Sequence, residues 1–285
     1  PKVVLLDLDT MVMDNDDAKQ REGVDHTYKN VAGFQPLQLK WGPYFVDCVF
    51  RGGSKHSNYG DTVVEMVEHV VEEIRAEYDR DVPIVLTADI GFFDQVNFRA
   101  FEDLGIGYVV GGKLYPDIEE KVENSPEENW ITLTKEDGRI YRLLSFEDRR
   151  GSWEKSRRAI YTRLVDEGNL IPFRFAQHRR VYYTNLGRSD EINASLIGAN
   201  KKNWLTAAGV VNLAHGRGDD ERTHRSLKEF GTEKLPCQDF EPNTAFYYTM
   251  VFSLNLEESF KRDVTKDQIR PVCYPSTFKR KFIDV

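Results

Sequence analysis

The sequence has few cysteines, and their arrangement argues against two common uses of this residue. Three cysteines occur in 285 residues, namely Cys48, Cys237 and Cys273, and no two of them form a CxxC pair. An odd number of widely spaced cysteines supports neither a disulfide framework nor a zinc knuckle. A reducing, intracellular setting is therefore expected, and we predict a cytoplasmic location.

Long apolar runs are also missing. No stretch approaches the roughly 20 apolar residues that a membrane-spanning helix requires, so no membrane partner is expected. No signal peptide is visible either. The chain opens at Pro1 without a methionine and continues directly into an apolar segment, which leaves open whether a DNA-binding or other segment precedes it.

The sequence lacks an overall excess of positive charge. Its formal net charge is -8, whereas proteins that bind nucleic acids are usually basic. Residues 141–180 nevertheless contain ten Lys and Arg against five Asp and Glu, a local net charge of +5. Because clustered charge matters more than the total, this segment is a candidate for contacts with phosphates. The 40% of hydrophobic residues is enough to build a packed core.

The order of apolar and amphipathic segments predicts an α/β protein. In the first part of the chain, apolar runs predict strands at 3–6, 44–50, 83–88 and 106–110. Apolar residues at helical spacing predict helices at 61–78 and 94–104. Such alternation is typical of a sheet covered by helices. Short strand-like pieces follow at 130–134, 139–144 and 181–184, and helices return at 211–230 and 243–261. We therefore predict three segments: 1–112, a β-rich insertion at 113–205, and 206–285.

Two aspartates stand where predicted strands end. Asp9 follows the first apolar run, and Asp89 follows the strand predicted at 83–88. Ligand sites of open α/β sheets lie at the carboxyl ends of strands, and hard divalent cations prefer oxygen ligands. The two carboxylates could therefore share a metal ion. The alternative is that each aspartate only caps a turn or helix.

A third acidic residue lies among basic residues near the C-terminal end. If residues 217–228 are helical, Arg217, Glu221, Arg225 and Lys228 fall on one face. One interpretation is a solvent-exposed face held by salt bridges. The other is a metal-binding Glu221 beside cations that hold DNA phosphates.

Together these residues resemble the DDE transposases of bacterial insertion sequences. The third motif of that family has Tyr, Arg, Glu and Lys separated by two, three and six residues, and Arg217, Glu221 and Lys228 match this spacing. The second motif is similar to Asp89-Ile-Gly-Phe-Phe, and the first to Asp7-Leu-Asp9-Thr-Met. Ala214 replaces the Tyr, Ile90 replaces a Ser and Met11 replaces a Thr. Asp7 is therefore kept as the alternative to Asp9.

The resemblance implies a fold and an activity. The fold would be a ribonuclease-H-like core, a mixed sheet with helices on both faces, interrupted by the β-rich insertion. The catalytic residues would be Asp9, Asp89 and Glu221, holding two Mg²⁺ or Mn²⁺ ions. The activity would be cleavage at transposon ends and transfer of the 3′-hydroxyl into target DNA. The partners would be double-stranded DNA, as terminal repeats and target, and a second copy in a homodimer, associated with the bacterial nucleoid when bound to DNA.

The same resemblance assigns DNA contacts. Arg217, Lys228 and Arg225 would hold phosphates near the cut, and Arg157 and Arg158 of the insertion would follow the DNA backbone. Trp153 would stack on an unpaired base, although a tryptophan in a small subdomain is more often part of the core.

Two other functions are consistent with parts of the sequence. Asp7-Leu-Asp9-Thr-Met also resembles the motif of haloacid-dehalogenase-type phosphatases, in which Asp7 would be the nucleophile and Asp9 the general acid/base. The departures at Met11, Ile90 and Ala214 suggest an inactive, DNA-binding transposase relative. Hydrolysis of a small phosphate ester would identify the phosphatase, and metal-dependent DNA cleavage separates the active from the inactive transposase.

Overall fold

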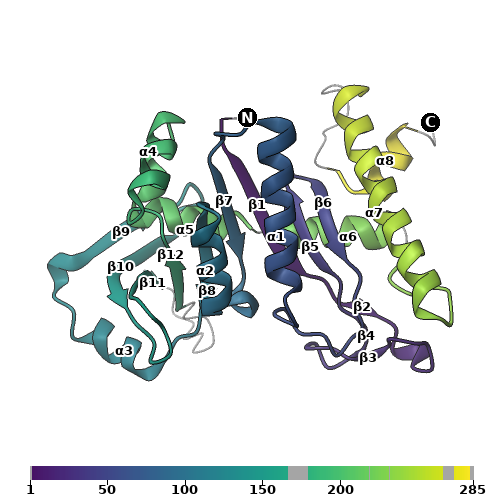
Figure 1. Ribbon diagram of the computed structural model, residues 1–285, viewed down its shortest axis with the longest axis horizontal. Coiled ribbons are helices and arrows are strands. Elements are labelled where there is room, and N and C mark those ends of the chain that lie inside the picture. The colour runs from purple at the N-terminus through teal and green to yellow at the C-terminus, as the bar shows by residue number, and fades with distance from the viewer. Residues whose placement is uncertain (1, 166–178, 218, 231, 266–272, 283–285) are drawn as a thin grey trace. The chain divides into compact units, whose positions relative to one another are not determined.

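The computed structural model describes residues 2–165, 179–217, 219–230, 232–265 and 273–282, and the side chains of residues 219–222 and 230 are outside that description (Figure 1). Its contacts divide the chain into two units. The first unit comprises residues 1–5 and 71–216, and the second comprises residues 6–70 and 217–285. Each unit has strands, helices and a core of its own.

The first unit contains a mixed sheet. Its strands are β7 (Ile84–Ala88), β8 (Gly107–Gly112), β9 (Trp130–Thr134), β10 (Ile140–Asp148), β11 (Arg157–Val165) and β12 (Arg180–Thr184). They lie in the order β7-β8-β12-β11-β10-β9. Strands β7 and β8 are parallel, and the remaining pairs are antiparallel.

Helices cover both faces of this sheet. They are α2 (Gln95–Asp103), α3 (Pro116–Glu123), α4 (Asp190–Gly198) and α5 (Ala207–Gly216), with short 3-10 helices η3 (Ile90–Phe92), η4 (Glu127–Asn129) and η5 (Lys202–Leu205). Val210 of α5, Leu196 of α4 and Val109 of β8 belong to one buried hydrophobic cluster on one face of the sheet. Tyr108, the preceding residue of β8, stacks on Phe98 of α2 with ring centroids 5.1 Å apart. Successive side chains of a strand point to opposite faces, so α2 covers the other one.

The second unit has two smaller groups of strands. Strand β1 (Val4–Thr10) begins in the first unit and continues into the second, where it pairs antiparallel with β5 (Leu37–Trp41), which in turn pairs with β6 (Tyr44–Val49). The short strands β2 (Met13–Asp14), β3 (Asp25–His26) and β4 (Ala32–Phe34) form a separate sheet. The helices are η1 (Asp16–Ala18), α6 (Asp219–Phe230), α7 (Phe240–Asp263) and α8 (Pro275–Phe282). Helix α1 (Thr62–Glu73) begins in this unit, and its last residues and the π-helical turn η2 (Ile74–Tyr78) that follows it belong to the first unit.

The core of the second unit joins its strands to α6 and α7. Leu227 of α6 and Tyr247 of α7 are fully buried in the same cluster as Phe34 and Phe50. The rings of Phe50 and Tyr247 lie 5.2 Å apart, within the usual range for aromatic pairs. This cluster fixes α6 relative to the strands around β1.

Most predicted elements of the α/β pattern are present. The helix predicted at 94–104 is α2: Asp94 caps it by accepting a hydrogen bond from Val96 N (2.8 Å), and Gly105 follows it with a φ of +63°. The left-handed backbone at this position favours glycine. The helix predicted at 243–261 is α7, and that at 61–78 comprises α1 and η2.

Several elements differ from the predictions. Strand β5 was not predicted, and its polar residues Gln38 and Lys40 are buried because Tyr247 and Asp7 pair with them. The basic stretch after residue 149 contains a regular strand, β11. The helix predicted at 211–230 is two helices, α5 and α6, and the chain turns at Arg217 between them.

The predicted β-rich segment contains strands, and they lie in the same sheet as β7 and β8. Strand β12 pairs with β8 from Val181↔Gly112 to Thr184↔Val109. The strands of this segment thus extend the first unit's sheet, and its role as an insertion stays a prediction. The physical reason for the extension is that β8 has an edge that β12 can pair with, a long-range relationship that local sequence does not reveal. Within the described ranges, no helix is both long and apolar enough to cross a membrane.

Candidate functional site

Strand β1 places two carboxylates on one side. Leu6, Leu8 and Thr10 are buried, and the alternating residues Asp7 and Asp9 are partly exposed. In the antiparallel pairing with β5, Asp7 lies opposite Lys40 and Asp9 lies opposite Gln38. Both aspartates are therefore inside the strand, rather than beyond its end as the sequence had suggested, and they point to the same face.

Asp7 is the partner of two cations. Arg217 Nε donates to its Oδ1 over 2.5 Å, and Lys40 Nζ lies 3.3 Å from its Oδ2. The side chain of Lys40 is only 2% exposed. A buried ammonium group requires a compensating charge, so Asp7 has a clear role in holding the second unit together.

Asp9 has a different environment. Its Oδ1 accepts a hydrogen bond from Thr10 N (2.8 Å). Its Oδ2 lies 3.9 Å from Arg217 Nη2 and 3.7 Å from His224 Nε2, both longer than a hydrogen bond. Of the two carboxylates, Asp7 therefore has the shorter contact with Arg217.

Helix α6 carries the third predicted acid. Glu221 lies in its first turn, three residues before His224, and its side chain is among those that are not described. The contact of His224 with Asp9 shows that α6 lies against β1 at this carboxylate. The backbone thus brings the turn that carries Glu221 close to Asp9, while the position of the Glu221 carboxylate stays a prediction.

Arg217 does not lie on the helical face predicted for it. It occupies the turn before α6, because α5 ends at Gly216. From there its Nη2 donates to Leu8 O (3.1 Å) while its Nε binds Asp7. The predicted set of four residues on one continuous helix is therefore wrong for Arg217, which instead joins α6 to β1.

The other two basic residues of this motif pair with nearby acids. Lys228 forms an ion pair with Glu233, which also accepts a hydrogen bond from Asp14 N (3.2 Å). Arg225 Nε donates to Glu229 Oε1 over 2.7 Å, and its guanidinium lies 4.3 Å from the ring of Tyr274. Salt bridges therefore exist on this helix, as the alternative interpretation expected, and contact of these residues with DNA stays a prediction.

His224 was not among the predicted site residues. Its side chain is 17% exposed, and its Nε2 is buried with no hydrogen-bond partner in the described part of the chain. Burial, together with Lys40, lowers its pKa to about 3 although Asp7 opposes this. The ring is therefore neutral near pH 7. The sequence signal for it was the spacing Glu221-Arg-Thr-His224, a Glu-x-x-His pattern.

Asp89 belongs to the first unit. It directly follows β7 and caps η3, its Oδ1 accepting a hydrogen bond from Gly91 N (2.8 Å). A Cβ atom on Gly111 of β8 would lie 2.9 Å from Ile90 N, so glycine is needed for β8 to pass this turn. The alternative interpretation of Asp89 as a capping residue is thus confirmed for its Oδ1.

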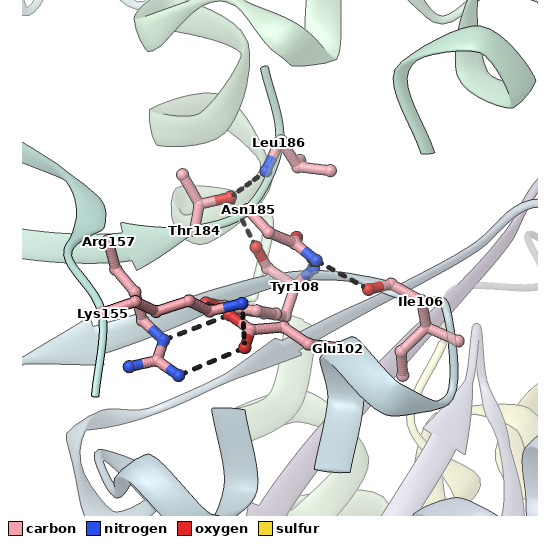
Figure 2. A network of polar contacts seen from close by, with 8 residues as sticks. All are labelled: Glu102, Ile106, Tyr108, Lys155, Arg157, Thr184, Asn185 and Leu186. Atoms are coloured by element: carbon pink, nitrogen blue, oxygen red, sulfur yellow. Dashed lines mark hydrogen bonds and ion pairs between the residues drawn. The ribbon is translucent and has the colours of Figure 1, made fainter. Parts of the chain in front are cut away.

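The basic segment of the first unit is largely engaged within the fold. Figure 2 shows Arg157 bound to Glu102 of α2 through Nε (3.1 Å) and Nη2 (3.2 Å). Lys155 Nζ lies 3.0 Å from the same carboxylate, and Tyr108 donates to it as well. Although burial opposes it, these hydrogen bonds hold the pKa of Glu102 below its ordinary value. Only 6% of the Arg157 side chain is exposed, so in this structure Arg157 contributes to the fold through its ion pair with Glu102.

The same network connects β8 to the end of β12. In Figure 2, Asn185 accepts from Tyr108 N and donates to Ile106 O, both over 2.9 Å, and Thr184 Oγ1 donates to Tyr108 O. Arg158 extends from β11 and donates through Nη1 to Leu186 O and Leu205 O, each over 2.7 Å. Both arginines predicted to follow DNA therefore already have protein partners.

Trp153 is packed inside an aromatic cluster. It is 5% exposed, and its ring lies 5.6 Å from Phe93 and from Phe98 and 5.2 Å from Tyr183. The guanidinium of Arg157 lies 5.1 Å from the same ring. This is the core position that the sequence offered as the alternative. Stacking of Trp153 on a DNA base would first require this cluster to open.

No group of three or more His, Cys, Asp or Glu side chains within the described residues is arranged to hold a metal ion. Asp9 and Asp89 belong to different units, and Glu221 has no described side chain. The predicted site of three carboxylates therefore stays a prediction.

Comparison with known families decides what the chain is related to. The family model described as transposase DDE domain group 1 matches residues 1–285. The chain belongs to this DDE transposase family. The match confirms the resemblance inferred from the three motifs, and it decides against the phosphatase family. No curated protein matches the chain.

One similar solved structure is the cryo-EM structure of a piggyBac transposase synaptic complex with hairpin DNA. It has a TM-score of 0.34 and 11% sequence identity to this transposase domain, and the match covers 93% of this chain and 55% of that one. The chain thus spans about half the length of that transposase. At this level of similarity the comparison carries no argument about the site.

Proposed function

We propose that this transposase domain cleaves phosphodiester bonds at transposon ends and joins the freed 3′-hydroxyl to target DNA. The observation that carries the proposal is the family match over residues 1–285, taken with the position of α6, whose His224 lies 3.7 Å from Asp9. On this basis Asp9, Glu221 and Asp89 are the catalytic carboxylates, and double-stranded DNA is the substrate. A ribonuclease-H-like core, a β-rich insertion and a homodimer on paired DNA ends belong to the same proposal.

The residues present suit two Mg²⁺ or Mn²⁺ ions. Carboxylate oxygens are the preferred ligands of these cations. When bound, a pair of divalent ions activates the attacking oxygen and stabilises the leaving oxygen. Asp9, Asp89 and Glu221 would hold the pair.

The cations around β1 organise the carboxylates. Arg217 binds Asp7 and the carbonyl of Leu8, and so fixes the strand on both sides of the peptide that leads to Asp9. Lys228 and Arg225 lie on α6, and each pairs with an acidic residue that is close in the sequence. Lys228 pairs with Glu233, and Arg225 pairs with Glu229. DNA phosphates compete with surface carboxylates for such cations, so both residues could exchange their partners for the DNA backbone.

The experiment uses duplex DNA taken from the two flanks of the gene in its own genome, where the terminal repeats of an insertion sequence lie. Strand cleavage is followed on sequencing gels with Mg²⁺ or Mn²⁺. We expect cleavage that leaves a 3′-hydroxyl, and we expect Glu221→Gln, Asp9→Asn and Asp89→Asn each to abolish it while DNA binding persists. Arg99→Gln is a matched control, because Arg99 is exposed and pairs with Glu154 at the surface.

Two results would contradict the proposal. Cleavage by Glu221→Gln at the rate of the unchanged protein would remove Glu221 from the catalytic set. Tight binding of the flanking DNA with no cleavage under any divalent ion would instead identify an inactive, DNA-binding relative.

A further inference from the structure

We propose that two loops of the second unit form a binding surface for an unpaired DNA strand. They are the first loop, residues 27–30 between β3 and β4, and the second loop, residues 51–59 after β6. Each loop contributes one tyrosine that stacks on a base and one lysine that holds a phosphate. The inference rests on the proposed function, because it takes DNA as the substrate, and it adds a surface that none of the three motifs contains.

Each loop has an exposed tyrosine beside a lysine of the same loop. The side chains of Tyr28 and Tyr59 are 60% and 43% exposed. Lys55 Nζ lies 3.8 Å from the centroid of the Tyr59 ring, and Lys29 Nζ lies 5.8 Å from that of Tyr28. Proteins bind single strands through aromatic rings that stack on bases and cations that neutralise the backbone. Both kinds of group therefore stand together in each loop.

A buried glutamine connects the two loops. Gln35 is 2% exposed, and its Oε1 accepts a hydrogen bond from Tyr28 N (3.3 Å). Its Nε2 donates to Gly53 O (2.7 Å) and to Lys55 O (2.9 Å). One side chain thus holds the backbone of both loops, so their tyrosines and lysines are positioned before a ligand binds. Such preorganisation reduces the entropy cost of binding.

The second loop is packed closely against the strands that flank the first. A Cβ atom on Gly53 would lie 2.2 Å from the carbonyl oxygens of Asp25 in β3 and Gly33 in β4, so only glycine allows this approach. Arg51, which is 5% exposed, donates from Nη1 to Ser57 O (3.3 Å) within the loop. The two loops therefore belong to one folded surface.

This surface adjoins the end of β1 that carries Asp9. Thr10, the last residue of β1, donates from Oγ1 to Ser57 Oγ over 3.4 Å. The strands that flank the first loop are joined to the same end, because Met13 of β2 pairs with Phe34 of β4. A DNA strand that is cleaved at Asp9 would therefore pass beside both loops.

The charge of this region is opposite to that of the whole chain. Residues 26–60 contain four Lys and Arg against one acidic residue, a local net charge of +3, whereas the chain has a net charge of -8. A local excess of positive charge attracts the phosphates of a nucleic acid even when the total charge is negative.

The two lysines are available to phosphates. Among the described side chains, no carboxylate forms an ion pair with Lys29 or Lys55. The pKa of Asp25 is lowered mainly by hydrogen bonds from His26 N and Ser54, and Lys55 contributes less to this change. Both ammonium groups can therefore bind a phosphate without first losing a protein partner.

The exposed rings favour an unpaired strand over a duplex. The bases of a duplex are stacked on each other, so a side chain can stack on them only after the duplex opens. A duplex backbone would need the lysines alone and would leave both tyrosines without a role. An unpaired strand uses both kinds of side chain.

The test measures binding of fluorescent oligo(dT), about 15 nucleotides long, to the full chain in EDTA. Neither cleavage nor a metal ion enters this readout. We expect Tyr28→Leu and Tyr59→Leu each to weaken binding about tenfold. Combined Lys29→Gln and Lys55→Gln should make the slope of log affinity against log salt concentration shallower by about 1.4.

A second measurement uses the unchanged protein. Oligo(dT) that contains 5-iodouracil is cross-linked by light to aromatic side chains on which the base stacks, and we expect the cross-links at Tyr28 and Tyr59. The matched controls are Tyr78→Leu, which replaces a 47% exposed tyrosine, and Arg99→Gln, which removes a surface cation paired with Glu154. Both controls should bind oligo(dT) as the unchanged protein does.

The possible results are distinguishable. Unchanged oligo(dT) binding in both tyrosine variants, or cross-links only at other residues, would overturn the inference. Weaker duplex binding in the lysine variant, with no effect of the tyrosines, would identify a contact with a duplex backbone and would also overturn it. Cleavage of terminal-repeat DNA by a protein that does not bind oligo(dT) would reject this surface alone. Binding of oligo(dT) without cleavage under any divalent ion would reject the proposed function and retain the surface.

Discussion

Arg217 donates from Nε to Oδ1 of Asp7 over 2.5 Å, across 210 residues of sequence. This ion pair gives different roles to two aspartates that the sequence could not distinguish. Asp7 neutralises Arg217 and the buried Lys40, while Asp9, two residues later on the same face of β1, lies beside His224. The pair also explains why Arg217 stands in the turn before α6 rather than within the helix.

Asp7→Asn is expected to destabilise the protein more than Asp9→Asn. The substitution leaves Lys40, which is 2% exposed, and Arg217 without their shared counter-charge. Removal of one partner of a buried ion pair costs about 3–5 kcal/mol. Asp9→Asn keeps the acceptor for Thr10 N and should cost less than about 1 kcal/mol. Urea unfolding of both variants measures the difference, and equal losses of stability would contradict the separate roles.

Gly111→Ala is expected to displace the turn that carries Asp89. A Cβ atom at this position would lie 2.9 Å from Ile90 N and 3.3 Å from the carbonyl carbon of Asp89, and backbone atoms cannot move aside without moving the turn. We expect a loss of about 1–3 kcal/mol in the free energy of unfolding and a larger proportional loss of DNA cleavage.

The control for this prediction is Gly198→Ala. Gly198 is the last residue of α4, and no atom lies within 4 Å of its added Cβ. Alanine should leave stability unchanged or raise it by up to about 1 kcal/mol. Similar behaviour of the two variants would show that β8 and the Asp89 turn are not tightly packed.

Arg157→Ala is expected to lower the free energy of unfolding more than it weakens DNA binding. Arg157 is 6% exposed and bound to Glu102 through two nitrogens, so its loss leaves a buried carboxylate with fewer partners. We expect a loss of about 3 kcal/mol in the free energy of unfolding, measured by urea titration. A different result would show that Arg157 contacts a phosphate, as the sequence suggested. In that case stability is unchanged, and the slope of log DNA affinity against log salt concentration becomes shallower by about one.

His215 is expected to make the free energy of unfolding depend on pH under mildly acidic conditions. Burial, with Lys135 and Arg180 nearby, lowers its pKa to about 4 from an ordinary value of 6.5. Between these values the unfolded chain binds a proton that the folded chain does not, so stability rises with pH across this range and is lost as pH falls from 6.5 towards 4. By pH 4.5 the loss is about 2–3 kcal/mol.

The measurement is the free energy of unfolding at several pH values between 7 and 4.5. His215→Gln removes the titrating group and should flatten this dependence, whereas His69→Gln, an exposed histidine, should not. A slope that is unchanged in His215→Gln would mean that other groups cause the acid sensitivity.

Local sequence predicted much of the fold. The cap at Asp94, the glycine after α2 and the apolar spacing of α1 and α7 depend on neighbouring residues, and the corresponding helices were found. The strands at 83–88 and 130–134 were also identified from short apolar runs. Strand β5 was missed, because the burial of Lys40 and Gln38 depends on Asp7 and Tyr247 in other elements.

The sequence by itself indicated the family, through the spacing of Arg217, Glu221 and Lys228 and through Asp9 and Asp89. The family match confirms the family, and the roles of these residues stay predictions. Only the tertiary structure decided which aspartate of β1 is held by cations, that Trp153 and Arg157 are buried, and that His224 faces Asp9. These properties arise from contacts between residues far apart in the chain. A motif states which groups are present, but their charge state and accessibility depend on the neighbours that folding brings to them.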